Sequence, residues 1–309
     1  MKGAAQHLVF DVGGTQLRAA LWDADRNDLS PVHAVDAPSH ARHPRLSWAE
    51  LRARLIAEMS LLRERLDPGG QVHSVAVAFP GPVDPDRRIL AAPTLWGALG
   101  QYPYELNREL AGRWPGTRVH VLNDVSAAGY RYSNEAEDSF CIVTVSTGIG
   151  NKVFAGGRPL VGPSGRGGEI GHLQVESGPG AALCDCGGRG HLGAYASGRG
   201  LVARAREDGG RGPTEFQRSF LATCLKLEPD AVTAEALAQA YAAGDEWATR
   251  QVERASDALG GVLAALCMGV GIERLVLIGG LAVGLGPRFA KAVGGAVEGR
   301  CGLGAGSAI

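Results

Sequence analysis

A glycine turn between two apolar strands near the start of the sequence constrains the fold most. A strand predicted over residues 8–10 (LVF) runs into Asp11, Gly13, Gly14 and Thr15, and a second strand is expected over 17–22. The two glycines therefore predict a β-hairpin turn. An ordinary hairpin needs only the glycines, but here an acid precedes them and a hydroxyl follows. Turn N–H groups can approach phosphate oxygens, and Asp11 could hold Mg²⁺ directly or through water.

The same pattern returns at the head of the second half of the chain. A strand predicted over 140–147 leads into residues 146–150 (STGIG), and another strand is expected over 152–155. The repeated order of strand, hydroxyl-glycine turn and strand predicts two related α/β domains that face each other. A nucleotide phosphate chain would lie between the two turns. Neither turn is a Walker A loop or a G-x-G-x-x-G turn.

The pair Asn123-Asp124 is where we place the chemistry. It follows a short strand predicted over 118–122, and small residues suited to a helix come after it. An Asn-Asp pair supplies an N-cap at the carboxyl end of a strand, where open α/β sheets collect ligands. Taken alone, the pair is better explained as a plain helix cap. Glycine turns that suit a nucleotide phosphate lie on both sides of the pair in the sequence. They favour its interpretation as part of an active site.

Composition bounds the class of protein. The chain has 309 residues, 45% of them hydrophobic and 20% charged, which is typical of a globular protein with room for two domains. Its net charge of −1 gives no electrostatic case for nucleic acid or a membrane surface as a partner. Six cysteines in a chain of this length do not form a secreted disulfide framework. We find no secretory leader and no run of about eighteen apolar residues, so we expect a cytoplasmic protein.

Apolar spacing predicts further helices and strands. A helix over 46–66 places Leu51, Leu55, Met59 and Leu62 on one face. Other helices are expected over 103–113, 233–243, 245–266 and 287–297, and strands over 32–35, 72–79 and 273–278. The last strand ends in a turn at Gly279 and Gly280. Loops at 80–84 and 92–97 could line a ligand cleft or simply connect elements.

Four side chains have the residue types of a structural zinc site. Cys184 and Cys186 are one residue apart, His191 follows five residues later, and His172 lies upstream. Two thiolates and two imidazoles complete a tetrahedral set with no open position, which is typical of structural rather than catalytic zinc. Cys-x-Cys is a weaker signal than Cys-x-x-Cys, and ordinary turn cysteines remain the alternative.

Seven motifs in this order resemble the ROK family, which holds bacterial glucokinases, other sugar kinases and sugar-responsive repressors. They are DVGGT at 11–15, PGPVD at 80–84, ND at 123–124, STGIG at 146–150, E-x-x-H at 169–172, CDCG at 184–187 and YASG at 195–198. Each motif is weak alone, but seven in the order of the family are specific together. The resemblance covers nearly the whole chain and thins after about residue 285.

The resemblance implies a fold and a domain organisation. The fold is α/β, the two-domain actin-like ATPase fold of the hexokinase superfamily (ribonuclease H-like), with ATP and Mg²⁺ in an interdomain cleft. A small N-terminal domain would comprise residues 1–122. A larger domain, 123–309, would carry the zinc-binding loop, and the extreme C-terminus could pack back on the small domain.

The resemblance also assigns roles by motif. Asp124 is implied to be the general base and Asn123 a ligand for a sugar hydroxyl. Glu169 and His172 are implied sugar contacts, with His172 also binding zinc through its other ring nitrogen. The implied nucleotide contacts are Gly13, Gly14, Thr15, Thr147 and Gly148 in the phosphate hairpins, together with Gly279 and Gly280 on the adenosine side.

Three departures from the family pattern bear on the substrate. His191 replaces the third cysteine of the usual zinc motif and can still bind zinc. Gly193 replaces a glutamate that accepts from a sugar hydroxyl, and Thr94 stands where many members carry an asparagine that contacts the sugar. Lost acceptors imply a different substrate. We therefore expect an ATP-dependent kinase for an amino sugar or a C7-cyclitol, acting on a primary hydroxyl, rather than for plain glucose.

Three alternatives stay open at this point. One is an ordinary glucokinase, the second is a non-catalytic sugar-sensing regulator of the same family, and the third is a zinc-stabilised binding protein without turnover. Regulators usually carry a DNA-binding helical domain before the first hairpin, whereas here Asp11 lies almost at the terminus and no basic region is left over. Dimers are common in the family, so a homodimer is compatible with the resemblance.

Overall fold

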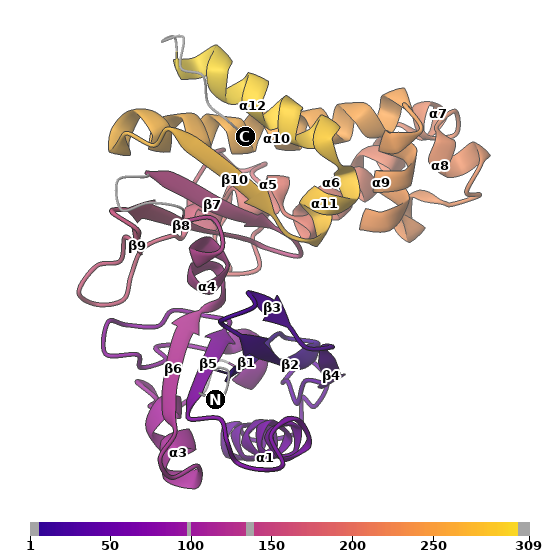
Figure 1. Cartoon of the computed structure of the whole chain (residues 1–309). Coiled ribbons are helices and arrows are strands. Elements are labelled where there is room, and N and C mark those ends of the chain that lie inside the picture. The colour runs from indigo at the N-terminus through magenta and orange to yellow at the C-terminus, as the bar shows by residue number, and fades with distance from the viewer. Residues whose placement is uncertain (1–5, 98–99, 134–138, 302–309) are drawn as a thin grey trace. The chain divides into compact units, whose positions relative to one another are not determined.

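The computed structural model describes residues 6–97, 100–133 and 139–301 (Figure 1). Contacts divide the chain into two compact units. The first unit runs to Ala128 and takes in Val161–Gly167, while the second holds Gly129–Leu160 and the chain from Gly168 onward. The predicted domains 1–122 and 123–309 stay a prediction.

The first unit is built on a six-stranded sheet in the order β3-β2-β1-β5-β6, with β4 also pairing with β2. The strands are β1 (Gln6–Val12), β2 (Gln16–Asp23), β3 (Asp28–Leu29), β4 (His33–Asp36), β5 (Ser74–Phe79) and β6 (Arg118–Asn123). β1 and β2 are antiparallel neighbours, so the predicted first hairpin is confirmed. β1, β5 and β6 run parallel, which brings their carboxyl ends to one edge of the sheet.

Helix α1 (Trp48–Leu66) covers this sheet with the predicted apolar face. It begins in a capping box, in which Ser47 and Glu50 satisfy each other's backbone N–H groups, and it ends at Asp67. Its buried residues include the four predicted from spacing: Leu51, Leu55, Met59 and Leu62. The unit also contains α2 (Pro93–Trp96) and α3 (Leu106–Arg113). The prediction of a loop over 92–97 is wrong in that Pro93 begins a short helical turn, which buries Trp96.

The second unit has a four-stranded sheet in the order β10-β7-β8-β9. Its strands are β7 (Phe140–Val145), β8 (Ile149–Ala155), β9 (Arg158–Pro159) and β10 (Arg274–Ile278). β7 and β8 are antiparallel, as the second predicted hairpin requires, but β8 begins three residues earlier than the predicted start at Lys152. Pairing of Ile149 with Val145 draws the end of the glycine turn into the ladder. β10 runs parallel to β7.

The second unit also contains helices and short 3₁₀ turns. They are η1 (Ile170–His172), α5 (Gly193–Ala196), α6 (Gly198–Arg211), α7 (Pro213–Phe216), α8 (Phe220–Thr223), η2 (Pro229–Ala231), α9 (Ala234–Ala242), α10 (Glu246–Val270), α11 (Gly280–Leu285) and α12 (Pro287–Cys301). The predicted helices over 233–243 and 245–266 correspond to α9 and α10, whose N-caps are Thr233 and Asp245. Gly279-Gly280 leads directly into α11.

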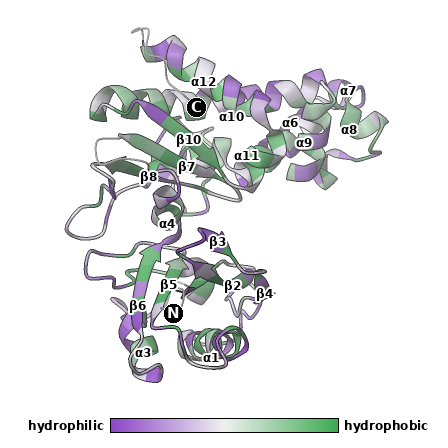
Figure 2. Ribbon diagram, viewed as in Figure 1, coloured by the Kyte–Doolittle hydropathy of each residue, from purple (hydrophilic) through white to green (hydrophobic). Residues whose placement is uncertain are grey.

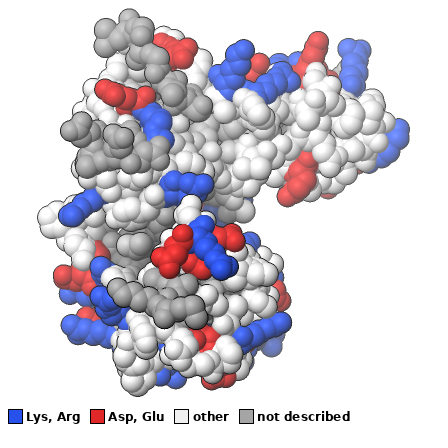
Figure 3. All heavy atoms as spheres, viewed as in Figure 1, with Lys and Arg blue, Asp and Glu red and all other residues white. Residues whose placement is uncertain are grey.

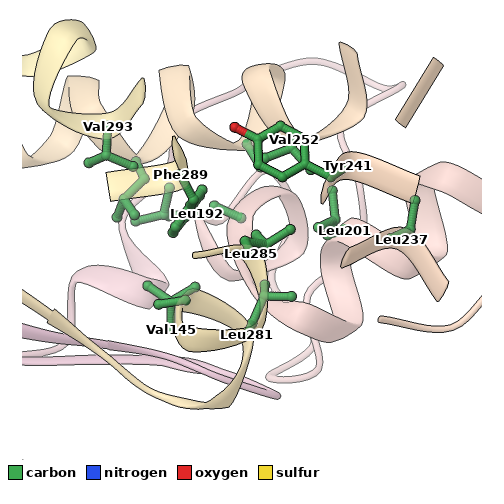
Figure 4. Packing of buried hydrophobic residues seen from close by; sticks show 14 of the residues in the cluster. Val145, Leu192, Leu201, Leu237, Tyr241, Val252, Leu281, Leu285, Phe289 and Val293 are labelled. Carbon is green, nitrogen blue, oxygen red and sulfur yellow. The ribbon is translucent and has the colours of Figure 1, made fainter. Parts of the chain in front are cut away.

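The largest apolar core lies between these helices and β7 (Figure 4). α10 and α12 pack side by side over β10 and β7 (Figure 1), and β7 and β8 are drawn largely in hydrophobic green (Figure 2). The labelled core residues are Val145, Leu192, Leu201, Leu237, Tyr241, Val252, Leu281, Leu285, Phe289 and Val293. A second core beneath α1 belongs to the first unit. Each unit therefore has its own hydrophobic core.

Charge is spread over the surface in both signs. On the face drawn in Figure 3, Lys and Arg side chains alternate with Asp and Glu side chains, in keeping with a net charge of −1. In the described part of the chain, no helix is both long and apolar enough to span a membrane.

Candidate active site

The Asn123-Asp124 pair forms the junction between β6 and α4 (Asp124–Tyr130). β6 ends at Asn123, and the helix begins at the next residue. Asn123 Oδ1 accepts a hydrogen bond from the backbone N–H of Ser126 at 3.0 Å. Asn123 is therefore the N-cap, as the sequence predicts.

The strand register brings three sequence motifs of the first unit to the same sheet edge. Asn123 on β6 lies opposite Phe79 on β5, and Ala78 lies opposite Asp11 on β1. The loop that begins at Pro80, the first hairpin and the Asn123-Asp124 pair therefore follow directly from neighbouring strand ends. This is the position at which parallel sheets gather ligand-binding groups.

Two donors hold one oxygen of the Asp124 carboxylate. Oδ1 accepts from Asn123 Nδ2 at 2.9 Å and from the backbone N–H of Val125 at 2.8 Å. Asn123 Nδ2 also donates to the carbonyl of Gly81 at 2.9 Å. Both polar atoms of the Asn123 side chain are thus engaged, and in this structure the side chain fixes the carboxylate and the neighbouring loop. Its predicted role as a ligand for a sugar hydroxyl stays a prediction.

The loop at 80–84 is held rigidly in the position that Asn123 contacts. Gly81 has φ +119°, and a Cβ there would lie 2.3 Å from the carbonyl oxygen of Ala91, so only glycine fits. The buried Asp84 carboxylate accepts from Arg88 N at 2.8 Å and Arg88 Nε at 2.7 Å. Burial acts to raise the pKa of Asp84, but these hydrogen bonds and the charge of Arg88 outweigh it and hold the pKa below its usual range.

Residues 161–167 pack against this loop. Gly165, with φ +70°, comes so close that a Cβ there would lie 2.8 Å from Asp84 Cα and 2.9 Å from Leu90 Cδ1. Sequence reasoning missed this contact, because the glycines of the 162–171 stretch indicate tight turns without saying which distant segment they touch.

The first hairpin closes tightly and leaves its polar side chains accessible. Gly13 N donates to Gln16 O at 2.8 Å, and a Cβ on Gly13 would lie only 3.0 Å from that same oxygen. Thr15 is exposed. Asp11 is also exposed, and its carboxylate pairs with Arg18 Nη1 at 2.9 Å. A half-exposed carboxylate of this kind can serve as an oxygen ligand for Mg²⁺ once its ion pair with Arg18 is broken.

The second hairpin is backed by helices and borders a cavity. Ser146 N donates to Gly148 O at 2.9 Å to close the turn, and Gly198 N, at the start of α6, donates to Ser146 O at 2.7 Å. Gly279 has φ +101°, and a Cβ there would lie 2.6 Å from the Val145 carbonyl oxygen, so the start of α11 needs glycine to approach β7.

Beside this hairpin lies a largely apolar cavity of about 440 Å³. The structure brings two predicted nucleotide contacts, Thr147 and Gly280, to its wall. The remaining wall comes from α6, α9 and α11, including Val202, Ala238 and Leu281. The largely apolar lining suits the ring of a nucleobase. Gly148 instead lines a neighbouring cavity of about 610 Å³.

The four predicted zinc ligands come together in the second unit. One ligand atom from each of His172, Cys184, Cys186 and His191 lies within 4.8 Å of all the others. Cys186 Sγ lies 3.1 Å from His191 Nδ1, and the two imidazole rings are 5.8 Å apart at their centroids. Burial raises the pKa of the Cys184 thiol. The number, type and spacing of these donors fit a tetrahedral structural zinc ion.

Local backbone structure explains how the ligands converge. A tight turn, with Gly187 N donating to Cys184 O and Cys184 N donating to Gly188 O, both at 2.8 Å, folds the Cys-x-Cys segment back. A Cβ on Gly188 would lie 2.2 Å from His191 Cε1, so glycine makes room for that imidazole. η1 presents His172 from the other side of the loop.

The predicted sugar contacts are only partly brought together. Glu169 and His172 are both exposed: Glu169 is the N-cap of η1 and His172 is its last residue, and His172 N donates to Glu169 O at 3.0 Å. His172 lines the larger cavity, of about 610 Å³. The side chain of Thr94 lies outside the described part of the chain. The roles of these three residues toward a substrate stay predictions.

The comparisons with known proteins come from both sequence and structure. The chain is 38% identical over 290 residues to a C(7)-cyclitol 7-kinase of Streptomyces hygroscopicus subsp. jinggangensis, which covers 93% of this chain and 82% of that protein. It is 32% identical over 308 residues to a 2-epi-5-epi-valiolone 7-kinase of an Actinoplanes strain, covering 95% of this chain and 83% of that one.

Among solved structures, the ROK hexokinase of Thermus thermophilus is similar with a TM-score of 0.69 and 29% identity, over 95% of this chain and 88% of that chain. The predicted actin-like α/β fold is confirmed by this likeness. The family model of the ROK family matches residues 8–297, so the resemblance seen in the motifs is confirmed as well. The chain belongs to the ROK family.

Proposed function

We propose that this chain is an ATP-dependent kinase that phosphorylates a primary hydroxyl of a C7-cyclitol. The observation that carries the proposal is the Asp124 carboxylate, fixed at the carboxyl edge of the parallel strands by Asn123 Nδ2 and Val125 N. A carboxylate held in one orientation can receive a proton from an alcohol without first having to reorganise.

In the proposed reaction the alcohol oxygen attacks the γ-phosphorus of ATP. The hydroxyl proton passes to the Asp124 carboxylate as the new O–P bond forms, and the bond from the γ-phosphorus to the β–γ bridging oxygen breaks to release ADP. A sugar alcohol is too weak an acid to lose its proton beforehand, so the base acts during the displacement. The protein mainly positions groups and neutralises charge in such a transfer.

The nucleotide base is assigned to the cavity beside the hairpin of the second unit. In the second unit the 440 Å³ cavity would take the adenine ring, and its apolar side chains would stack against the faces of the ring. Thr147 and Gly148 would then offer turn N–H groups to phosphate oxygens, and the phosphate contacts expected of Gly13 and Gly14 stay predictions. Mg²⁺, when bound with ATP, neutralises phosphate charge, and Asp11 is the carboxylate we assign to it.

The substrate class is assigned from the relatives and from one position in the chain. Two relatives with at least 32% identity over at least 93% of this chain are named as 7-kinases of cyclitols. At Gly193, where sugar kinases of the resemblance carry a glutamate, a Cβ would lie 3.2 Å from Gly171 O. A glutamate at this position would need Gly171 O to move by a few tenths of an ångström. The local structure therefore favours a substrate whose hydroxyls do not depend on a carboxylate here.

We also propose that His172, Cys184, Cys186 and His191 hold a structural zinc ion. A bound zinc supplies a cross-link between η1 and the Cys-x-Cys turn, and it takes no part in the transfer. Purified protein should contain about one zinc per chain, measured by elemental analysis. His191→Ala should weaken zinc binding by at least about tenfold, because a three-ligand site remains, whereas His43→Ala, far along the chain from these ligands, should leave zinc unchanged.

A substrate panel tests the kinase assignment directly. ADP release would be measured with ATP and, in turn, C7-cyclitols, amino sugars and glucose at equal concentration. We expect the highest kcat/KM with a C7-cyclitol, and a product that carries phosphate on the primary hydroxyl. A clear preference for glucose would make the chain a glucokinase, and absence of turnover with every alcohol would contradict the kinase proposal.

A further inference from the structure

Arg199 connects the Cys-x-Cys turn to the second hairpin. Its Nη2 pairs with Asp185 Oδ2 at 2.7 Å, and its Nε donates to the carbonyl of Thr147 at 3.2 Å. The Arg199 side chain also lines both the 440 Å³ cavity and the 610 Å³ cavity. One guanidinium group therefore contacts two segments that sequence motifs assign to different tasks.

The backbone holds Arg199 at this position. Gly198 N donates to Ser146 O at 2.7 Å, and a Cβ on Gly198 would lie 2.8 Å from that oxygen, so α6 begins in direct contact with the hairpin. Ser197 caps the helix by accepting from Gly200 N at 3.1 Å. The first turn of α6 is thus anchored, and the direction in which Arg199 leaves the helix is set by the fold.

Asp185 is the other end of the connection, and it stands between two candidate zinc ligands. Cys184 and Cys186 are its chain neighbours, so a metal that fixes both sulfur atoms also fixes the backbone that carries Asp185. The side chains of Asp185 and Arg199 are 64% and 61% exposed. An exposed ion pair contributes little free energy when both side chains lose conformational entropy to form it. The pair becomes more favourable when one partner is already fixed in place.

We propose that Arg199 is a positioning residue that couples metal occupancy of the Cys-x-Cys turn to nucleotide affinity at the second hairpin. The inference rests on the proposed function, because it needs a nucleotide bound beside Thr147. Metal binding orders Asp185, Asp185 holds Arg199, and Arg199 holds the Thr147 carbonyl so that the turn keeps the conformation that accepts phosphate.

The test measures nucleotide affinity in two metal states. Wild-type protein, either zinc-loaded or treated with a chelator, would be titrated with the ATP analogue AMPPNP and Mg²⁺ by calorimetry, with zinc content determined for each sample. We expect zinc to lower the Kd by about three- to fivefold, in the low range of coupling between sites because the ion pair is exposed. By reciprocity, AMPPNP should raise zinc affinity by the same factor, measured by competition with a chromogenic chelator.

Two variants remove the connection without touching a candidate metal ligand. In Asp185→Asn and in Arg199→Gln the dependence of Kd on zinc should fall below about 1.5-fold, with zinc content retained. The double variant should lose no more than either single variant, because both remove one interaction. Glu215→Gln is the matched control, since it breaks another exposed ion pair of the second unit, Arg250–Glu215 at 2.7 Å, and should keep the full dependence.

The outcomes separate the inference from the proposed function. If Asp185→Asn keeps the zinc dependence of the wild type, the coupling proposal is wrong. It is also wrong if Arg199→Gln weakens binding equally in both metal states while Asp185→Asn has no effect, because Arg199 would then bind the nucleotide itself. If wild-type protein binds no AMPPNP in either state, the proposed function fails and the coupling fails with it.

Discussion

The hairpin of the first unit and the hairpin of the second unit have the same local construction and different surroundings. Each joins two antiparallel strands through a turn in which glycine stands beside a hydroxyl residue. The first is flanked by an exposed ion pair, Asp11–Arg18. The second is contacted by the N-terminus of α6, by Arg199 and by a cavity wall.

This difference suggests a division of labour between the two units. The first unit supplies a fixed carboxylate, Asp124, at the same sheet edge as its open hairpin. The second unit supplies a supported turn and an apolar cavity that suits a nucleobase. A repeated local motif is therefore compatible with different tasks, because the elements packed around it differ.

The largest expected effect concerns the carboxylate of the first unit. Asp124→Asn removes the proton acceptor while keeping a side chain of the same shape, so kcat should fall by at least about 100-fold with AMPPNP affinity unchanged. Steady-state ADP release and calorimetric titration measure the two quantities. A large loss of AMPPNP affinity with kcat retained would place the nucleotide, rather than the chemistry, at this residue.

The next effect concerns the loop that Asn123 contacts. The pKa of Asp84 lies below its usual range, so its charged form stabilises the fold above about pH 4, and this contribution is lost as the pH falls through the lowered pKa. Asp84→Asn should lower the free energy of unfolding by about 2 kcal/mol at pH 7. The difference from wild type should begin to shrink as the pH falls below about 4, the usual pKa of an aspartate, and should go on shrinking as Asp84 is protonated.

Urea denaturation at pH 7, 5 and 3 measures this difference. Asp86→Asn is a suitable control, since Asp86 also pairs with Arg88, at 3.1 Å, but its side chain is 75% exposed. It should change stability by less than about 1 kcal/mol. An equal effect of both substitutions would show that the buried hydrogen bonds to Asp84 are not what stabilises the loop.

A third prediction fills the cavity of the second unit. Ala238 on α9 lines it, so Ala238→Leu should raise the Kd for AMPPNP about tenfold by occupying space meant for the base. The kcat at saturating ATP should be nearly unchanged, because the substitution affects binding of the base and leaves the Asp124 carboxylate as it is. Ala242→Leu, on the exposed side of the same helix, is the control. Equal Kd values for the two variants would exclude this cavity as the nucleotide site.

The smallest effect concerns the ion pair beside the first hairpin. Arg18→Gln should change the free energy of unfolding by less than about 1 kcal/mol, because both partners are about half exposed. It should also lower the Mg²⁺ concentration needed for half-maximal activity, since Asp11 no longer has a competing cation. Thermal unfolding and Mg²⁺ titration measure these effects, and a marked loss of stability would show that the hairpin depends on the pair.

Local structure could be predicted from the sequence where a residue type has a single structural role, such as glycine in a tight turn or leucine on the buried face of a helix. Gly13 and Gly14 predicted a turn, and Leu51, Leu55 and Met59 predicted the buried face of α1. The convergence of His172 with the Cys-x-Cys turn was also predictable, because the ligand types match one metal. Boundaries were less predictable where strand pairing decides them, as at Ile149, which tertiary pairing draws into β8.

Long-range contacts could not be predicted from the sequence alone. Nothing in the local pattern says that Asn123 reaches Gly81, or that Arg199 joins Asp185 to Thr147. Each of these contacts depends on the backbone path of two segments that are far apart in the chain. The family resemblance pointed to the residues but not to these partners.

The return of residues 161–167 to the first unit has a practical consequence for anyone who wishes to study that unit in isolation. A fragment cut after Ala128 would omit the strip of chain that carries Gly165, and the loop bearing Asp84 would lose its neighbour. Contiguous truncation is therefore the wrong way to dissect this protein. Joining residue 128 through a short linker to 161–167 would make the more faithful fragment.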